Sequence, residues 1–351
     1  MMKQPKMLAE WHEQEAIILA WPDQQTDWRP WLDSVRQTYK QLIRAISESG
    51  TGVILLVRAT DIEQLKSQFE GYHNLLLVSA DYNDTWCRDY AFLTCWDGEN
   101  MIPVEFTFNG WGNKFDASKD NQINQKVLAA LCANKLQTSS MVVEGGALEI
   151  DQNGHLLSTA MCLANPQRNG EMSLQEYEQT FKSVLGATKV TCLEHGHLEG
   201  DDTDGHIDTL VRYTPSQGLV IQSCYNRPTD SHFAGLSSLV EECRAALPEH
   251  RIFELPLPYL ENDEGERLPA SYANYLINNE QILCPTYRVP EDDIALQIIG
   301  RAYPDKKIVA IDSFPLVQQF GSVHCISMQV PKQTLKPEVV AAFKQHVTVW
   351  Q

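Results

Sequence analysis

The sequence predicts an α/β chain of 351 residues folded as one domain, 1–351, and three observations support this prediction. Short β-rich runs alternate with segments of helical periodicity from end to end. The composition is typical of a globular protein, with 43% hydrophobic and 21% charged residues. There is no low-complexity linker and no shift in composition that would mark a domain boundary.

Short apolar runs bounded by turn-forming residues predict the strands, and longer amphipathic segments predict the helices. The predicted strands are Val53–Val57, Leu75–Val78, Met101–Phe108, Met141–Val143, Ala147–Ile150, Leu219–Gln222, Ile282–Pro285, Ile308–Ile311 and His324–Val330. The predicted helices are 31–48, 61–70, 120–134, 173–185, 234–247, 291–302 and 336–346.

Local signals support several of these boundaries. Ser173 and Glu176 have the spacing of a capping box, and Pro337 suits a first helical turn. The segments 151–154 and 214–218 have the composition of turns between strands. No internal repeat is visible in the sequence.

The balance of charge restricts the class of partner. Lys and Arg total 28 against 46 for Asp and Glu, so the formal net charge is −18. A nucleic-acid partner is not expected, because binding phosphates requires basic surface. A negative field can concentrate a cationic substrate. Solubility alone accounts for the acidity equally well.

Nine cysteines are scattered through the chain without a C-x-x-C pair. An odd number of dispersed cysteines in a long chain predicts reduced thiols and a cytoplasmic location. Residues 1–13 lack the apolar core of a signal peptide, and no uncharged apolar stretch is long enough to span a bilayer. We therefore expect no membrane partner.

The segment Gly200–Asp208 carries an unusual density of acids before a histidine. On a strand, His206 and Asp208 would project from the same face. They could act as a general base with a positioning carboxylate, or belong to a divalent metal site formed by carboxylates of the Asp201–Asp208 cluster. No EF-hand or H-E-x-x-H spacing supports the metal. The alternative without function is an acidic surface loop that leads into a strand.

Cys325 is a candidate nucleophile, since it follows Gly321 and Ser322 and begins an apolar run. A cysteine thiolate is an effective nucleophile when its surroundings lower its pKa. The alternative is a buried core cysteine, which is the default for any one of nine.

Carboxylates placed beside predicted strands suggest a guanidinium site. Asp89, Asp208 and Glu144 supply three, and carboxylates bind the planar guanidinium fork in bidentate fashion. Trp86 and Trp111 could form walls of the site through cation–π contact. Ordinary packing explains the two tryptophans equally well.

Eight short motifs together resemble the agmatine deiminase branch of the guanidine-modifying (pentein) superfamily. They occur in the family's order from residue 9 to residue 325, and each alone is weak. They are Ala9-Glu10-Trp11 with Ala20-Trp21-Pro22, Asn83-Asp84-Thr85-Trp86 with Arg88-Asp89, Phe108-Asn109-Gly110-Trp111-Gly112, Glu144-Gly145-Gly146, Asn165-Pro166-Gln167-Arg168-Asn169, Gly200–Asp208, Leu268–Asn274 and Gly321–Cys325.

The resemblance implies a five-bladed α/β propeller of ββαβ modules with pseudo-fivefold symmetry. It implies Cys325 as nucleophile, His206 as general acid and base, Asp89 and Asp208 as guanidinium ligands, and Glu144 as a support for histidine and substrate. The implied reaction converts agmatine and water into N-carbamoylputrescine and ammonia through a covalent cysteine–amidino intermediate, in polyamine metabolism. No metal or organic cofactor is implied, and a homodimer would fit the family.

Two departures from the family pattern bear on which amine is the substrate. Tyr90-Ala91-Phe92 stands where many members place a glycine, and Gly321-Ser322-Val323 replaces Gly-Gly-Asn-Ile before the His-Cys pair. Asp202 is our candidate for the distal ammonium of agmatine.

Three alternatives stay open from the sequence. The first is a deiminase of arginine or peptidyl-arginine, which would use an additional arginine such as Arg168, Arg212, Arg227 or Arg288 for the substrate carboxylate. The second is a metal-binding hydrolase that uses the Asp201–Asp208 cluster. The third is a polyamine-binding protein without catalytic activity.

Overall fold

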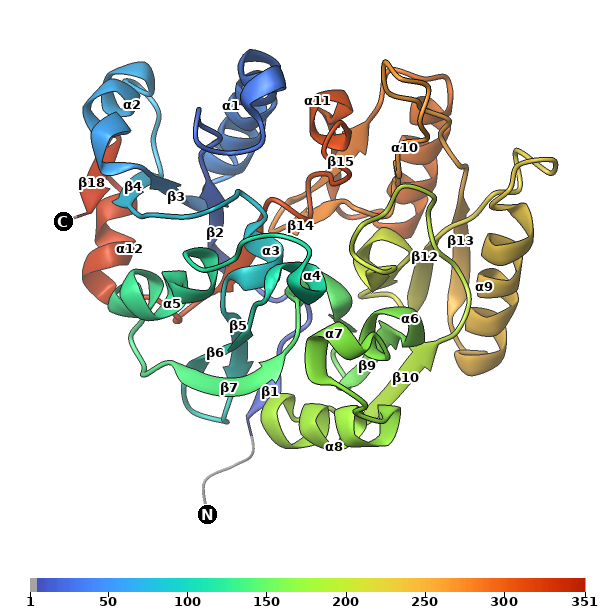
Figure 1. Cartoon of the computed structure of the whole chain (residues 1–351). Helices are drawn as coiled ribbons and strands as arrows, with labels where there is room; N and C mark the ends of the chain where they lie inside the picture. Colours follow the sequence, from blue (N-terminus) through green and yellow to red (C-terminus); the bar gives the residue numbers. More distant parts are fainter. Residues whose placement is uncertain (1–4, 351) are drawn as a thin grey trace. The chain divides into compact units, whose positions relative to one another are not determined.

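A computed structural model describes residues 5–350 of the chain. Residues 1–4, which belong to the segment examined for a signal peptide, and residue 351 lie outside the described part. The chain forms two compact units (Figure 1). Among the described residues, unit 1 comprises residues 5–145 and 325–350, and unit 2 comprises Gly146–His324.

The larger sheet of unit 1 has five strands in the order β17-β2-β3-β4-β18. The strand β17 (Met328–Pro331) pairs antiparallel with β2 (Gln14–Ala20). The neighbours β3 (Gly52–Val57), β4 (Leu75–Ser79) and β18 (Thr348–Trp350) continue in parallel. Every residue of β3 is buried, which explains its continuous aliphatic sequence.

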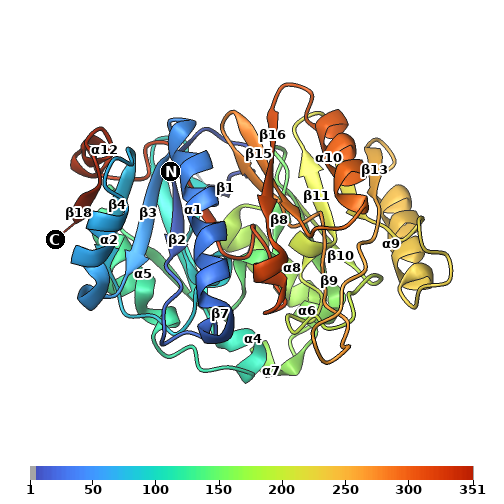
Figure 2. The same ribbon diagram turned by 90° about the horizontal axis from the view of Figure 1, so that it is seen from above.

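Helices α1 (Leu32–Glu48), α2 (Ile62–Gln68) and α12 (Pro337–Phe343) accompany this sheet. Figure 2 shows α1 along the strands, and it packs against β3. Its buried side chains recur every three or four residues and so form one apolar face; they include Val35, Tyr39, Leu42, Ile43 and Ile46.

The second sheet of unit 1 has the order β1-β5-β6-β7. Its strands are β1 (Lys6–Met7), β5 (Leu93–Trp96), β6 (Met101–Thr107) and β7 (Gln137–Val142). The short helices α3 (Cys87–Tyr90), α4 (Gly110–Asn113) and α5 (Ile123–Lys126) lie in the connections. Two of these connections carry candidate site residues, Asp89 and Trp111.

Unit 2 contains three sheets of three strands each. The strands are β8 (Glu149–Ile150), β9 (His155–Thr159) and β10 (Lys189–Leu193), then β11 (Val211–Thr214), β12 (Gly218–Gln222) and β13 (Arg251–Leu255), then β14 (Leu276–Asn278), β15 (Gln281–Thr286) and β16 (Lys307–Asp312). The helices are α6 (Ala160–Leu163), α7 (Pro166–Asn169), α8 (Leu174–Leu185), α9 (Phe233–Ala246), α10 (Glu291–Ala302) and α11 (Phe314–Val317).

The same ββαβ order recurs in all three sheets of unit 2. In each, an antiparallel pair is followed by a helix and by a third strand parallel to the second. The helices that make these crossovers are α8, α9 and α10. In unit 1, β5-β6-α5-β7 and β17-β2-α1-β3 have the same pairing pattern. The described residues therefore contain five such modules, a repeat that was not visible in the sequence.

Most predicted elements are confirmed. Six of the seven predicted helices are present, and both predicted turns join antiparallel strands, β8 to β9 and β11 to β12. Ser173 and Glu176 form the predicted capping box. The predicted strands within 53–57, 75–78, 101–108, 219–222, 282–285 and 308–311 are also present.

Some predicted boundaries are wrong. The helix predicted over 120–134 is divided into short helices at Asp120–Gln122, Ile123–Lys126 and Leu128–Leu131, and Val127, between the last two, leaves the helical region at φ −129° and ψ −63°. The segment 147–150 begins in a 3-10 turn, and only Glu149–Ile150 is a strand. The strand predicted over His324–Val330 begins at Met328, and Cys325 lies in the turn before it. The strand β7 starts earlier than predicted, at Gln137, and ends at Val142.

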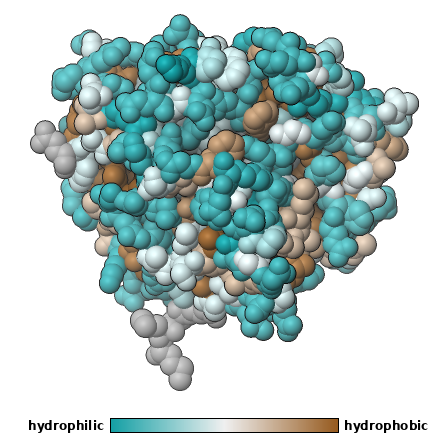
Figure 3. Space-filling view, viewed as in Figure 1, coloured by the Kyte–Doolittle hydropathy of each residue, from teal (hydrophilic) through white to brown (hydrophobic). Residues whose placement is uncertain are grey.

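The face drawn in Figure 3 is mostly hydrophilic, and its apolar residues form small separate patches. Within residues 5–350, none of the helices combines the length and the apolar character that crossing a membrane requires.

Candidate active site

In unit 1, hydrogen bonds of Arg88 join the helix α3 to the Cys325 turn and to the strand β17 that follows it. The Arg88 N–H donates to the Cys325 carbonyl at 3.1 Å, and the Arg88 Nη1 donates to Gln329 Oε1 at 2.6 Å. Arg88 and its neighbour Asp89 are both buried. Cys325 is itself only 7% exposed. These bonds keep the candidate nucleophile beside the segment that carries a candidate guanidinium ligand.

Gly145 brings the Glu144 segment to the same place. A Cβ atom at Gly145 would lie 2.1 Å from the Arg88 carbonyl oxygen and 3.1 Å from Met328 Cε. Only glycine permits this approach, since real Cβ contacts are never so short. Glu144 is 1% exposed. Unit 1 therefore gathers the segments of Asp89, Glu144 and Cys325.

Trp111 contacts Asp89 directly. Its indole Nε1 donates to Asp89 Oδ2 at 2.9 Å, and both side chains are buried. The Trp111 backbone is left-handed, at φ 56° and ψ 50°, which is unusual for a bulky residue. Asn109 stabilises the turn, because its side chain accepts from the Gly112 N–H at 2.9 Å. The Asn109–Gly112 motif thus aims an indole donor at a carboxylate.

Trp86 packs in an aromatic cluster. Its ring lies 5.3 Å from that of Trp28, between centroids, and 7% of its surface is exposed. Trp28 is fully buried and donates to Thr85 Oγ1 at 2.8 Å. The packing interpretation of Trp86 is therefore supported within unit 1, and a wall for the substrate remains a prediction.

Two buried carboxyls organise the loop before α3. Asp120 accepts the Asn83 N–H at 2.7 Å and the Asp84 N–H at 3.2 Å. Burial raises the pKa of Asp84 to about 7 and that of Asp120 to about 8, and their mutual repulsion adds to the shift of Asp120. The Asn83–Trp86 motif is therefore folded around a second carboxyl that the sequence did not single out.

In unit 2, the acidic segment is a tight loop and not the start of a strand. Asp201 Oδ2 accepts the Gly205 N–H at 2.6 Å, and Asp201 Oδ1 accepts both the Thr203 N–H and hydroxyl. Thr203 Oγ1 in turn accepts the His206 N–H at 3.1 Å. Gly205 has φ +79°, which favours glycine.

The strand predicted for His206 and Asp208 is thus wrong. His206 is the residue before a 3-10 helix, η6 (Ile207–Thr209), because the Asp201 loop turns the chain just upstream. Both side chains are nonetheless buried, His206 at 1% and Asp208 at 0% exposure. Cys162, in α6, places its Sγ within 4.8 Å of a ring nitrogen of His206.

Asp204, another acid of this loop, binds residues of the Asn165–Asn169 motif. Asp204 Oδ2 accepts from Arg168 Nη1 at 2.8 Å and from Asn165 Nδ2 at 2.9 Å. The Asn165–Asn169 motif therefore braces the loop. Among the described residues, no grouping of three potential metal ligands includes Asp201, Asp202, Asp204 or Asp208. Loop formation accounts for Asp201 and Asp204 without a metal.

Asp208 is held by His324. The distance from His324 Nδ1 to Asp208 Oδ2 is 2.6 Å, and the ring donates, because an ionised carboxylate can only accept. Burial opposes ionisation of Asp208. The hydrogen bond and the charges of His324, His206 and Arg212 outweigh it, so the pKa of Asp208 lies below its usual value.

The Leu268–Asn274 motif fixes both partners of this pair. Ser271 Oγ donates to the Thr209 carbonyl at 2.6 Å, next to Asp208. The His324 N–H donates to the Asn274 carbonyl at 3.2 Å and to its Oδ1 at 3.1 Å. The motif therefore acts as a scaffold for the His206–Asp208 segment and for the chain just before Cys325.

The sequence matches the family of Porphyromonas-type peptidyl-arginine deiminases over residues 6–331. The chain belongs to this family. The match includes every candidate site residue, from Trp86 to Cys325.

Known relatives align with nearly the whole length of this chain. A Vibrio parahaemolyticus protein named "Putative agmatine deiminase" is 31% identical, over 92% of this chain and 96% of its own. The structure of a cysteine-to-serine variant of C. jejuni agmatine deiminase with substrate bound is 30% identical, with a TM-score of 0.86 over 95% and 97% of the two chains. A Porphyromonas gingivalis structure named "Putative Arginine Deiminase" is 35% identical, with a TM-score of 0.87 over 95% and 100%.

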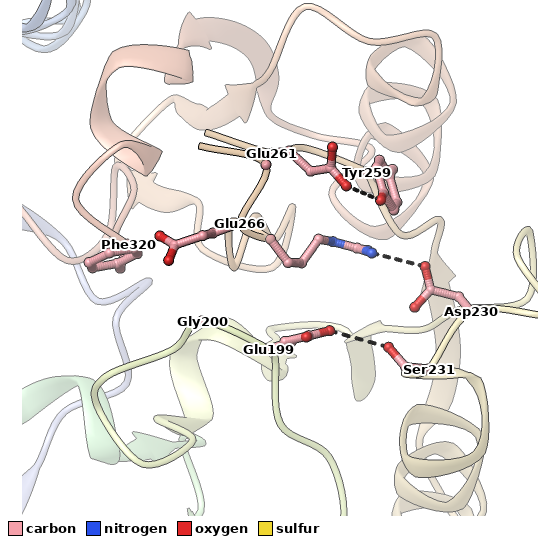
Figure 4. Close-up of a pocket in the computed structure, with 10 residues that line it drawn as sticks. Glu199, Gly200, Asp230, Ser231, Tyr259, Glu261, Glu266 and Phe320 are labelled. Atoms are coloured by element: carbon pink, nitrogen blue, oxygen red, sulfur yellow. Dashed lines mark hydrogen bonds and ion pairs between the residues drawn. The ribbon is translucent and has the colours of Figure 1, made fainter. Parts of the chain in front are cut away.

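A pocket of about 680 Å³ lies within unit 2 of this deiminase-family chain (Figure 4). Its lining includes Glu199, Gly200 and Phe320, which neighbour the acidic loop and the Cys325 turn in sequence. Its acids have partners: Asp230 binds Arg267 at 3.1 Å, and Glu199 accepts from Ser231 at 3.3 Å. The pocket contains none of the predicted site residues.

Sequence reasoning did not identify three residues of unit 2 that contact or lie near the candidate residues: His324, Asn274 and Cys162. His324 and Asn274 lie inside two of the motifs that resemble the family, but those motifs assign no role to either residue. Cys162 lies in an apolar run and looks like a core residue. Only its proximity to His206 distinguishes it from the other buried cysteines.

Proposed function

We propose that this protein is an agmatine deiminase that hydrolyses agmatine to N-carbamoylputrescine and ammonia. The observation that carries the proposal is the full-length similarity to C. jejuni agmatine deiminase, which was solved with substrate bound as a cysteine-to-serine variant. The match of the chain to a deiminase family supports the same chemistry, hydrolysis of an amidine C–N bond.

In the proposed first step, the Cys325 thiolate attacks the guanidinium carbon of agmatine. The C–N bond to a terminal nitrogen breaks, and His206 supplies the proton with which that nitrogen leaves as ammonia. The substrate's positive charge favours the thiolate. The product of this step is an S-amidino enzyme.

In the proposed second step, water attacks the same carbon and His206 accepts its proton. The C–S bond then breaks and the remaining hydroxyl proton passes to solvent, which releases N-carbamoylputrescine and restores the thiolate. One histidine serves both steps because an imidazole titrates near neutral pH. We propose no metal or organic cofactor for either step.

Asp89 and Asp208 are the proposed ligands of the guanidinium, with Glu144 supporting the substrate and His206. Each aspartate is buried and held by a ring N–H, from Trp111 and from His324 respectively. Such fixed carboxylates suit a planar cation, because they lose little freedom on binding. Asp202 remains our proposal for the distal ammonium.

The arginines considered for an α-carboxylate favour agmatine over arginine. Each already forms an ion pair, at 2.6 to 2.9 Å: Arg168 with Asp204, Arg212 with Glu149, Arg227 with Glu291, and Arg288 with Asp312. A substrate carboxylate would therefore have to compete with, or share the arginine with, an acidic side chain that is already bound. Agmatine has no carboxylate and needs no such residue.

We further propose that the five ββαβ modules are the five blades of a pentein propeller. The recurrence of one pairing pattern in five sheets supports this arrangement. A single domain, a homodimer and a role in polyamine metabolism remain predictions.

The deciding experiment measures ammonia release from agmatine and from arginine by wild type and Cys325→Ala, with chelator present. We expect wild type to prefer agmatine, and Cys325→Ala to lose turnover by a factor of at least about 10³. Faster release from arginine would overturn the substrate, and inhibition by the chelator would favour the metal-hydrolase alternative. Agmatine binding without turnover in wild type would favour a polyamine-binding protein.

A further inference from the structure

The two carboxylate oxygens of Asp208 differ in their hydrogen bonding. Oδ2 lies 2.6 Å from His324 Nδ1, and the two side chains are 0% and 2% exposed. Oδ1 is buried and has no hydrogen-bond partner among residues 5–350. A buried acceptor without a partner is destabilising, so such atoms are rare in native proteins. This oxygen is available for a donor from a ligand.

Both partners are fixed through their backbones. His324 donates its N–H to the carbonyl and to Oδ1 of Asn274. Asp208 lies within η6, where the Thr209 hydroxyl donates to the His206 carbonyl at 2.8 Å and the Thr209 carbonyl accepts from Ser271. With both backbones held, the ring of His324 fixes the plane of the carboxylate.

The chemistry of the bond separates the roles of the two oxygens. The imidazole Nδ1–H occupies Oδ2 and favours the ionised form of the carboxylate. A guanidinium N–H is a charged donor that suits the remaining oxygen, because it satisfies a buried acceptor and pairs a buried charge. Without His324, the carboxylate could rotate and present either oxygen.

We propose that His324 is a positioning residue, whose Nδ1–H orients Asp208 so that Oδ1 accepts a guanidinium N–H of the substrate. This inference rests on the proposed deiminase function. It assigns to the residue before Cys325 a role that neither the sequence motif nor the similarity to relatives supplies.

The test compares kcat/KM for agmatine among wild type, His324→Phe, His324→Asn, Asp208→Asn and the double variant His324→Phe/Asp208→Asn. Loss of a hydrogen bond to a charged group predicts a decrease of about 10- to 100-fold for His324→Phe. His324→Asn retains an N–H donor near the position of Nδ1 and should recover most of the activity. The double variant should be no worse than Asp208→Asn, because His324 acts through Asp208.

His232→Phe is the matched control. His232 forms a similar buried pair with Asp230, at 2.7 Å, outside the proposed catalytic machinery. It should lose thermal stability to a similar degree while kcat/KM changes by less than about threefold.

Three results would overturn the inference. One is a His324→Phe enzyme that is folded and as active as wild type. Another is additive losses in the double variant, which would indicate a structural role independent of Asp208. A wild-type enzyme without agmatine or arginine turnover would instead overturn the proposed function, and the positioning role with it.

Discussion

Two buried carboxylates, one in each unit, are held by different kinds of donor. Asp89 accepts from the neutral indole of Trp111, and Asp208 accepts from an imidazole. Both bonds help to set the direction of the carboxylate that accepts them. At the scale of single residues, the proposed recognition of a cation would therefore depend also on groups that need not touch the cation themselves.

Trp111→Phe should test whether the indole N–H orients Asp89 for the substrate. The substitution keeps an aromatic ring but removes the N–H donor, so we expect KM for agmatine to rise about tenfold. Steady-state kinetics on purified enzyme measures it. Trp28→Phe removes the same donor from a neutral acceptor, Thr85, and should lower stability while leaving KM unchanged. Equal effects of the two substitutions on KM would contradict the role of Trp111.

The buried pair Asp84 and Asp120 should make the free energy of unfolding depend on pH. Their folded pKa values of about 7 and about 8 lie above the unfolded value of about 3.9. The folded state therefore binds more protons between pH 4 and 8, so this pair should lower the free energy of unfolding as pH rises through that window. Urea unfolding of wild type at pH 5, 6, 7 and 8 measures it.

Asp120→Asn is the matched variant, since it cannot ionise and keeps one acceptor oxygen. It should be less stable than wild type at pH 5, by about 1 kcal/mol, because it loses the acceptor for the Asp84 N–H. The deficit should shrink toward pH 8. A constant difference across the whole range would show that Asp120 is ionised in the folded protein.

At the scale of elements, the candidate residues of unit 1 lie where β7 ends, beside α3 and the turn before β17. The chain after β7 passes so close to α3 that Gly145 can have no side chain. The contact is between backbone atoms, so neighbouring side chains cannot move aside to relieve it. The position of Glu144 thus depends on the size of the next residue.

Gly145→Ala should therefore lower the thermal midpoint and the activity together. We expect a cost of about 1–3 kcal/mol, as for overpacking of a core. Gly235→Ala is the control: it lies in α9 with no atom within 4 Å of the added Cβ. It should raise stability by about 0.5–1 kcal/mol, the preference of a helix for alanine. An active, stable Gly145→Ala protein would contradict the close approach.

At the scale of the whole molecule, the chain carries a formal charge of −18. Agmatine carries two positive charges near neutral pH, so the field of the protein should attract it. This attraction acts over distances comparable to the Debye length and is removed by salt. We therefore expect the acidity to affect the encounter with substrate and not the chemical step.

We expect kcat/KM for agmatine to fall by about threefold or more between about 0.01 M and 0.5 M salt, while kcat changes little. Fixed-time assays of ammonia release at constant pH measure both kinetic parameters. Sodium chloride and potassium acetate at equal ionic strength should give equal effects. A kcat/KM that is indifferent to ionic strength would show that the net charge serves other purposes, such as solubility.

The sequence alone determined the α/β class, most helices, the turns and the family resemblance. These features depend on local periodicity, on capping and turn residues, and on short motifs, all of which are written in neighbouring positions. The segments that carry the candidate residues were identified for the same reason. Cys325, Asp89 and Asp208 each stood in a motif whose residue types indicated the chemistry.

Only the tertiary structure decided which groups hold these residues. His324 meets Asp208, Trp111 meets Asp89, and Gly145 meets Arg88, each across a long separation in the chain. The repeat of five ββαβ modules was also hidden, because strand pairing is conferred by backbone hydrogen bonds that many sequences can make. Distances between segments far apart in sequence follow from packing of the folded chain, and no local pattern encodes them.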